Sequence, residues 1–445
     1  MSESLSGTIK LSFGLIFFLL TFYIKQDQFY YLAGLYATLF GIYIYLVNTE
    51  SPRIKKYDYL NLLIKIILVF AFPLASDDIY RFYWDGHTLL EGISPFQYTP
   101  RALMTAYPLS WQGYFVKLNS PDYYSVYPPV LQGLFSLCAL LSFHSIAVFS
   151  IVWKSILLVA DYGTIQLLKK TDLQDQKKIS LWYAWNPLVI YEVIANGHPE
   201  GLMIFCMVAF IYYLKTARLI LSSVMLSLAA SVKIFPITLL LFIPKYLGFK
   251  TSLRYVAITF FVFCITMIPI YPFQQHVMDS LHLYYGKFEF NGSIFLLWKA
   301  FDYLRFGFDN VDHIAKWLSG CFMLVALYMY FKQKNQDKSS LIKSLFGLWL
   351  GYLLLSTTVH SWYVVPLILL GLLIDEYWII VWSGVAILSY AWYDRHIDEL
   401  HKYAFILIEY TVLLLAFLFR KRIVLSQRKI QVTACADECS SNEMN

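Results

Sequence analysis

The sequence predicts an all-α polytopic membrane protein, and three observations support this fold class. Of the 445 residues, 59% are hydrophobic and only 14% are charged, and the mean hydropathy of +0.56 lies outside the range of ordinary soluble domains. Apolar runs of about 15 to 24 residues, long enough to cross a bilayer as helices, recur between Leu11 and Phe419. Such runs must be helical in lipid, because a helix satisfies its backbone polar groups internally.

The first three apolar runs lie near residues 8–24, 29–47 and 60–75. No small-residue cleavage site follows the first run, so we expect a retained helix and not a signal peptide. Basic clusters between the runs indicate the cytoplasmic side, because lysine and arginine are enriched in cytoplasmic loops. These clusters are Arg53–Lys56, Lys169–Lys178, Lys215–Arg218, Lys245–Arg254, Lys332–Lys343 and Arg420–Lys429. With a cytoplasmic N-terminus, the third run ends on the outer side.

Residues 126–143 and 145–168 both have the composition of a span, although the basic clusters on either side allow only an odd number of crossings here. We therefore expect one of the two to be partial. Lys154 and Asp161 share one helical face and make the second run the less lipid-like of the pair. The whole chain is expected to contain about 11–13 transmembrane helices. Glu409, inside the last run, is a charge without an evident partner.

The chain is expected to form one domain, because no repeat of fixed period and no glycine-rich linker divides it. This transmembrane domain covers residues 1–425, and a polar cytoplasmic tail follows at residues 426–445. Two outer loops are expected, at residues 76–125 and 272–313.

Composition also argues against several classes of partner. The six cysteines have neither the spacing of a metal site nor that of a disulfide framework. The formal charge of +6 comes from the short clusters between apolar runs, so nucleic-acid binding is not supported. The phosphate-binding patterns G-x-G-x-x-G and G-x-x-x-x-G-K do not occur, so neither a nucleotide site nor a firm cofactor is predicted.

Two adjacent carboxylates, Asp77 and Asp78, directly follow the third apolar run. Either aspartate can cap the helix expected through Arg81 to Leu90 and complement its dipole. A tandem pair held at the membrane face also suits a general base or a divalent cation, although two carboxylates alone are a weak metal signal. Arg81 follows Asp77 by four residues and Asp78 by three, so on a helix it can pair with either, or it can bind phosphate.

Further polar residues are expected on the same outer side, at the ends of later runs. They are His198, Glu200, Lys233, His360 and Tyr363. Each also has an ordinary structural interpretation. His198 and Glu200 can cap or complement the start of a helix, and Lys233 can snorkel to the interface. His360 and Tyr363 can belong to an aromatic belt.

The serial order of several motifs resembles a known family. The stretches DDIYRFYWDG, GISPFQYTP and YSVYPPVLQGLF follow the third run, and WNPLVIYEVIANGHPE, SVKIFPITLL and STTVHSWYVVPL come further along. Together they resemble membrane glycosyltransferases of the GT-C superfamily. The pattern is closest to the bacterial polyprenol-phosphate-mannose-dependent mannosyltransferases and to the catalytic subunit of GPI mannosyltransferase I. The eukaryotic enzymes space their acids as Asp-x-Asp, whereas here the acids are adjacent, so either aspartate can correspond to the catalytic one.

The resemblance implies a GT-C-like bundle whose external loop carries short juxtamembrane helices. It implies transfer of a hexose, most simply mannose, from a polyprenyl-phosphate donor to a hydroxyl of a lipid or glycan acceptor. The reaction would be a single inverting step on the non-cytoplasmic face, in the plasma membrane or a bacterial inner membrane. Asp77 or Asp78 would be the general base. The positive charge for the leaving phosphate would come from outer cationic groups, namely Arg81, Lys233, His198 and His360.

Two other functions fit a long apolar chain. A multi-span transporter or lipid flippase would be expected to show paired repeats and polar sites at the bilayer midplane. Here the polar candidates gather at one outer surface, and no repeat is seen. A polysaccharide polymerase or ligase shares the lipid-phosphate substrate, but these enzymes depend more on external arginines and histidines than on an early pair of aspartates.

Overall fold

The computed structural model describes residues 3–49, 58–106, 112–170, 176–286, 288–334 and 336–421. The tail expected at residues 426–445 lies outside the described residues. Within the described ranges the regular elements are helices, and the only β contacts are isolated bridges that join Phe290 and Asn291 to Thr358. The expectation of an all-α polytopic membrane protein is confirmed.

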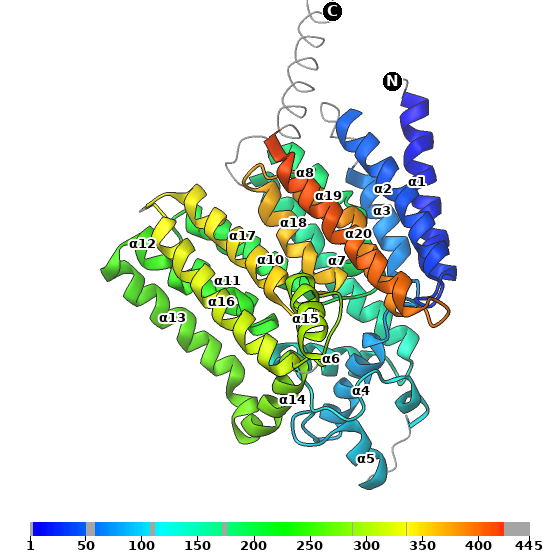
Figure 1. The fold of residues 1–445 in the computed structure, drawn as a ribbon, viewed down its shortest axis with the longest axis horizontal. Coiled ribbons are helices and arrows are strands. Elements are labelled where there is room, and N and C mark those ends of the chain that lie inside the picture. Colours follow the sequence, from blue (N-terminus) through cyan, green and yellow to red (C-terminus); the bar gives the residue numbers. More distant parts are fainter. Residues whose placement is uncertain are drawn as a thin grey trace, which may run out of the picture.

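The first three helices stand side by side at one edge of the bundle (Figure 1). They are α1 (Glu3–Tyr23), α2 (Phe29–Thr49) and α3 (Asp58–Val69). The buried residues of α2 recur every three or four positions, which is the spacing of one helical face. That face packs into the bundle, and the remaining apolar residues of α2 face outward, as expected for a helix in lipid.

The segment after α3 contains short helices at one end of the bundle. They are α4 (Asp78–Leu90), α5 (Pro100–Ala106) and η2 (Gln112–Lys117). Figure 1 shows α4 and α5 at the end opposite to that at which α1 begins and α20 (Glu399–Leu418) ends. The expected loop of short helices at residues 76–125 therefore has a counterpart in the structure.

A long helix follows, and it corrects the expectation about residues 126–168. α6 (Pro129–Leu141) has 13 residues, whereas α7 (Ile146–Lys170) has 25 and is long and apolar enough to cross a membrane. The second run is thus the more complete of the two. Its charged residues turn inward: Asp161 accepts a 2.6 Å bond from Lys65, and Lys154 donates to backbone carbonyls at the end of α3. Pairing inside the protein removes the cost of exposing these groups to lipid.

The middle of the chain contains a sharply bent helix. α8 (Gln176–Ala184) is followed by α9 (Pro187–Val189), η3 (Ile190–Ala195) and α10 (Glu200–Lys215). Asn186 caps α9 by accepting from the backbone amides of Leu188 and Val189. The helix through η3 meets α10 at 116°. The bend places the residues between η3 and α10 at a corner inside the protein.

The remaining helices complete the bundle. They are α11 (Leu219–Val232), η4 (Phe235–Leu241), α12 (Ile243–Leu247), α13 (Phe249–Met267), η5 (Ile268–Phe273), α14 (Gln274–Gly286), α15 (Ser293–Phe306), α16 (Val311–Lys332), α17 (Lys338–Leu355), η6 (Ser361–Val364), α18 (Val365–Leu372), α19 (Ile379–Val385), η7 (Ala386–Trp392) and α20. The outer loop expected at residues 272–313 contains α14 and α15. α9, η3 and α18 are buried along their whole length and lie at the centre of the protein.

Five described helices are long and apolar enough to cross a membrane. They are α2, α7, α16, α20 and the continuous stretch Phe249–Tyr284, and the bent pair Pro187–Ala195 with Glu200–Lys215 makes a sixth if it is one span. Other apolar helices have only 10–17 residues. The number of long helices is therefore below the 11–13 that hydropathy predicts, because many apolar runs are built from shorter helices.

Candidate active site

The two adjacent aspartates lie at the start of α4 and point to different partners. Asp77 is the N-cap residue, but its side chain makes no capping hydrogen bond. Its Oδ2 accepts a 2.8 Å bond from Nε2 of Gln26, in the loop between α1 and α2. Asp78 Oδ1 accepts a 2.8 Å bond from Nδ2 of Asn119. Burial raises the pKa of the Asp77 carboxyl above its usual value, opposed by the bond from Gln26 and assisted by the charge of Asp78.

Arg81 does not pair with either of these aspartates, which corrects the first expectation. Its Nε donates to Oδ1 of Asp85 at 2.7 Å, one helical turn further on, and both side chains are buried. Its NH1 donates to the backbone carbonyls of Ser120 and Tyr123. Gln132 of α6 donates to the other Asp85 oxygen at 3.0 Å. In this arrangement Arg81 ties the loop before α6 to α4.

His198, at the corner before α10, lies beside Asp78. Its Nε2 is 3.9 Å from Asp78 Oδ2 and 3.2 Å from the hydroxyl of Ser76. Gly197 has a φ of +79°, a conformation that glycine adopts without strain, and its carbonyl accepts a 2.7 Å bond from the indole of Trp153. The corner is thereby fixed against α7, and the fully buried imidazole faces the start of α4.

Glu200 and Lys233 form an ion pair near the same corner. Lys233 Nζ lies 2.7 Å from Oε1 of Glu200, and the Glu200 side chain is only 3% exposed. Lys233 also lies 3.4 Å from the centre of the Tyr363 ring, which is a close cation–π contact. The other Glu200 oxygen, Oε2, is buried and has no hydrogen-bond partner among the described residues. Glu200 and Tyr363 therefore hold the Lys233 ammonium at this corner, while 23% of the lysine side chain stays exposed.

A stack of rings joins His198 to His360. Trp362 lies between the two imidazoles, 3.8 Å from the His198 ring and 4.2 Å from the His360 ring, and is nearly parallel to both. His360 packs against Phe290 on its other side. Burial holds the pKa of His360 well below its usual value, and the nearby charges of His198 and Lys233 lower it further.

The hydroxyl of Tyr363 lies 2.5 Å from that of Tyr284. The backbone carbonyl of Tyr363 accepts a 3.0 Å bond from the indole of Trp349. Tyr284 of α14 therefore contacts the hydroxyl end of the tyrosine side chain, and Trp349 of α17 holds the Tyr363 backbone.

The structure thus brings Asp78, His198, Glu200, Lys233, His360 and Tyr363 into one cluster, hereafter the outer cluster. Asp77 lies at its edge, facing Gln26. Arg81 is turned away toward Asp85.

Sequence reasoning missed Glu192, which lies in η3 directly behind His198. Its carboxylate is 0% exposed, and Oε2 lies 3.0 Å from Nδ1 of His198. Ser361 and Tyr390 also donate to this carboxylate. The signal was present in the sequence, because Glu192 is an acid inside an apolar run, and such residues are rare unless they have a function.

Glu409 is a second buried acid, and the structure supplies the partners that the sequence did not reveal. Trp382 donates to one carboxylate oxygen at 2.8 Å, and Asn291 donates to the other at 3.1 Å. The interaction links α20 to the segment that bridges to Thr358. Glu409 therefore serves the packing of α20.

Among the described residues, no group of three or more histidine, cysteine, aspartate or glutamate side chains is arranged to hold a metal ion. Asp77 and Asp78, expected as a possible cation site, accept from two different amides and diverge. In the structure, each of the two aspartates therefore acts as a separate hydrogen-bond acceptor.

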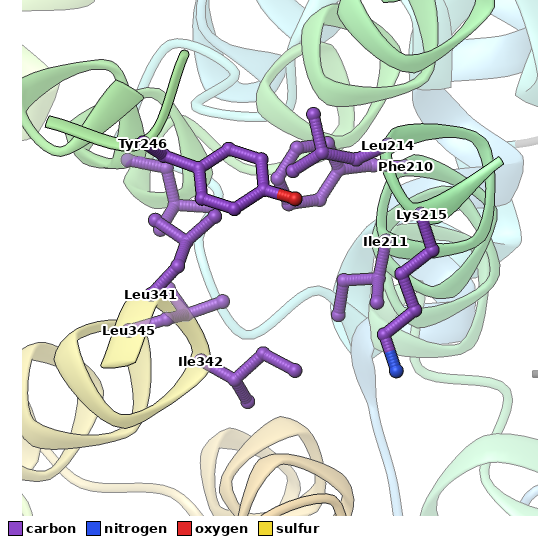
Figure 2. Close-up of a pocket in the computed structure, with 9 residues that line it drawn as sticks. Phe210, Ile211, Leu214, Lys215, Tyr246, Leu341, Ile342 and Leu345 are labelled. Carbon is purple, nitrogen blue, oxygen red and sulfur yellow. The ribbon is translucent and has the colours of Figure 1, made fainter. Parts of the chain in front are cut away.

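A small apolar cavity lies away from the outer cluster, at the other end of α10. Figure 2 shows Leu341, Ile342 and Leu345 of α17 on one side of this space and α10 on the other. Its α10 residues follow Glu200 by ten or more positions, which corresponds to about 15 Å or more along a helix. This cavity is therefore too distant to hold groups that react at the outer cluster.

A crevice too narrow to hold a water molecule lies beside the corner. Its walls include the loop Phe72–Ala75, which leads to Asp77, and Tyr191, Ala195 and Asn196 from the bent helix. Asn196 also donates a 3.1 Å bond to Glu192. None of the residues that line this crevice belongs to the outer cluster.

Comparison with known proteins supports an enzymatic assignment. A comparison with curated proteins finds no match. Residues 38–247 match the model of the MptA_B family, described as alpha-(1->6)-mannopyranosyltransferase, N-terminal domain. The matched segment contains Asp77, Asp78, His198, Glu200 and Lys233. This match confirms the resemblance to GT-C-like mannosyltransferases over the matched residues, and it supports a glycosyltransferase that transfers mannose and is built on apolar membrane helices.

Proposed function

We propose that the protein transfers mannose from a polyprenyl-phosphate donor to a hydroxyl of a lipid or glycan acceptor, with Asp78 as the general base. One observation supports this choice above the others. The Asp78 carboxylate lies 3.9 Å from His198, so an acid and a cationic group meet at the end of the bundle that carries α4 and α5. Asp77 instead faces Gln26.

The proposed step needs both kinds of group. An alcohol is a weak nucleophile at neutral pH, so a carboxylate must accept its proton as the oxygen attacks the anomeric carbon. The new bond joins the acceptor oxygen to that carbon, and the bond between the carbon and the phosphate oxygen breaks. The proton passes to Asp78, and the electron pair leaves with the phosphate. A single displacement of this kind inverts the anomeric centre.

Cationic groups of the outer cluster would stabilise the leaving phosphate. His198 lies 3.9 Å from Asp78, and Lys233 interacts with Asp78 by charge. Positive charge aimed at the oxygen that becomes negative lowers the barrier more than it strengthens substrate binding. The unpartnered Glu200 Oε2 is suited to accept from a sugar hydroxyl. We assign Arg81 to anchoring the loop before α6, because its guanidinium is engaged by Asp85.

We propose that the outer cluster lies on the non-cytoplasmic face. The basic clusters of the sequence adjoin helix ends such as the C-terminal ends of α7, α10 and α20. α20 ends at the side of the bundle opposite to α4 (Figure 1). Since basic residues favour the cytoplasm, α4 and the outer cluster then face outward.

Membranes that carry the protein should test this function with radiolabelled polyprenyl-phosphate-mannose. We expect label to move from the donor into a new lipid or glycan product. Membranes lacking the protein serve as the control. Movement of a solute across reconstituted vesicles without formation of a labelled product would contradict the proposal and indicate a transporter.

A further inference from the structure

Glu192 is a fully buried carboxylate that receives hydrogen bonds from four side chains. Ser361 Oγ donates to Oε1 at 2.6 Å, and the Tyr390 hydroxyl lies 3.1 and 3.2 Å from the two oxygens. Asn196 Nδ2 donates to Oε2 at 3.1 Å, and His198 Nδ1 lies 3.0 Å from the same oxygen. A buried carboxylate is costly unless its oxygens are satisfied, and here donors from three separate elements satisfy them.

The local backbone is built to direct Glu192 toward His198. η3 is a π-helix of six residues, and the amide of Asn196 donates to the carbonyl of Tyr191 at 2.8 Å, five residues earlier. A π turn is wider than an α turn and occurs often at functional sites. The backbone amide of His198 also donates to the Glu192 carbonyl at 3.0 Å. His198 is thus bound to Glu192 through both its imidazole ring and its backbone amide.

The two edges of the His198 ring face different groups. Nδ1 faces Glu192, whereas Nε2 faces Ser76 at 3.2 Å and Asp78 at 3.9 Å. Trp362 covers one face of the ring and prevents it from turning. An acceptor on Nδ1 requires a proton there, which leaves Nε2 as the edge that can exchange a proton or donate to an anion.

We propose that Glu192 is a positioning residue that holds His198 with Nε2 toward the reacting groups and stabilises the imidazolium while the phosphate departs. The inference rests on the proposed function and assigns one more residue to it. A carboxylate behind a histidine has the same effect in serine hydrolases, where it fixes the tautomer and stabilises the charged ring. Glu192 acts here through His198 and does not itself contact the substrate.

Several charged groups besides Glu192 act on His198 from the elements packed around it. Asp78 of α4 and Glu200 of α10 favour the charged imidazole. His360, beyond Trp362, interacts with it by charge. Lys154 of α7 passes close to Gly197, with its Nζ turned to the carbonyls of Leu68 and Ala71. Glu192 differs from these groups in being the acid in direct contact with the ring.

The test compares pH profiles of mannosyl transfer from polyprenyl-phosphate-mannose by the wild type and by Glu192→Gln. Glutamine keeps the size of the side chain but removes its charge. We expect kcat to fall about 100-fold with a small change in KM, the scale of a lost acid–base contribution. We also expect the alkaline limb of the kcat profile to move to lower pH, because the imidazolium loses its stabilising charge.

A double variant distinguishes positioning from a structural role. If Glu192 acts through His198, the Glu192→Gln change costs nothing further in the His198→Gln background. Independent losses that multiply in the double variant would overturn the inference, as would an unchanged alkaline limb. Absence of transfer by the wild type would instead overturn the proposed function.

Two further variants control for folding. Glu409→Gln makes the same substitution at another fully buried carboxylate, so it should leave the alkaline limb where it is even if stability falls. Glu192→Asp retains the charge and should retain the wild-type alkaline limb with a lower kcat. If Glu192→Gln does not accumulate, Glu192→Asp still tests the inference, because a shift of its alkaline limb to lower pH despite the retained charge would contradict the role of that charge.

Discussion

The carboxylate of Asp78 lies 3.9 Å from Nε2 of His198, although the two residues come from α4 and from the corner before α10. The contact unites an acid at the end of the third apolar run with a cation held by the bent helix. Neither residue alone distinguishes an enzyme from a helix cap. In the proposed reaction, these two residues and Lys233 would supply the opposite charges that transfer from a sugar phosphate requires.

Asp78→Asn should reduce mannosyl transfer by about 100-fold or more, because asparagine cannot accept the acceptor proton. The bond from Asn119 can still be accepted by an amide oxygen, so the fold should be kept. Transfer of radiolabel at equal protein level is the measurement. Asp77→Asn is the matched control and should have the smaller effect, since Asp77 faces Gln26. The reverse order of effects would make Asp77 the base.

Asp77→Asn should raise the apparent melting temperature at pH 8 by about 1–3 °C. Burial raises the pKa of Asp77 in the folded protein, so folding favours its neutral form. The stability contributed by protonated Asp77 is fully present below the pKa of this carboxyl in the unfolded chain. It is lost as the pH rises through the pKa of Asp77 in the folded protein. An asparagine stays neutral at every pH. The gain should therefore disappear near pH 3, and melting curves at both pH values check it.

Lys233→Met should abolish transfer and destabilise the protein by about 3 kcal/mol, because Glu200 is left as an uncompensated buried charge. The double variant Lys233→Met with Glu200→Gln removes both charges and should recover much of the stability. Its transfer activity should stay low, since the cation is still missing. Thermal unfolding and radiolabel transfer measure the two effects separately. Recovery of activity in the double variant would argue against a role for Lys233 at the phosphate.

Gly86→Ala should destabilise the contact between α4 and α6. A Cβ at this position would lie 2.4 Å from the carbonyl oxygen of Phe135, which is too close for any side chain. Overpacking of this kind costs about 1–3 kcal/mol. Gly133→Ala in α6 is the matched control, because no atom lies within 4 Å of its added Cβ. It should be neutral or slightly stabilising, as alanine is favoured over glycine within a helix. Equal unfolding temperatures for the two variants would refute the close packing at Gly86.

The sequence by itself determined the fold class and the general place of the site. The length and composition of an apolar run are local properties of the sequence. In lipid, an apolar run of this length forms a helix, because a helix satisfies its own backbone polar groups. Asp77 and Asp78 stood out because a tandem of carboxylates next to an apolar run is uncommon. His198, Lys233 and His360 could be assigned to the same side, since the positive-inside tendency sets the direction of each run.

The tertiary structure decided which of these side chains meet. Arg81 could pair equally well with acids one turn before or after it, and Gln132 and the loop carbonyls turn it toward Asp85. Lys154 and Asp161 suggested a partial span, but their partners on α3 make a long helix possible. The role of Glu192 could be inferred only from the hydrogen-bond donors that distant elements bring to its carboxylate. Helical spacing fixes where a side chain leaves its own helix, whereas the partner it reaches depends on how distant segments pack against it.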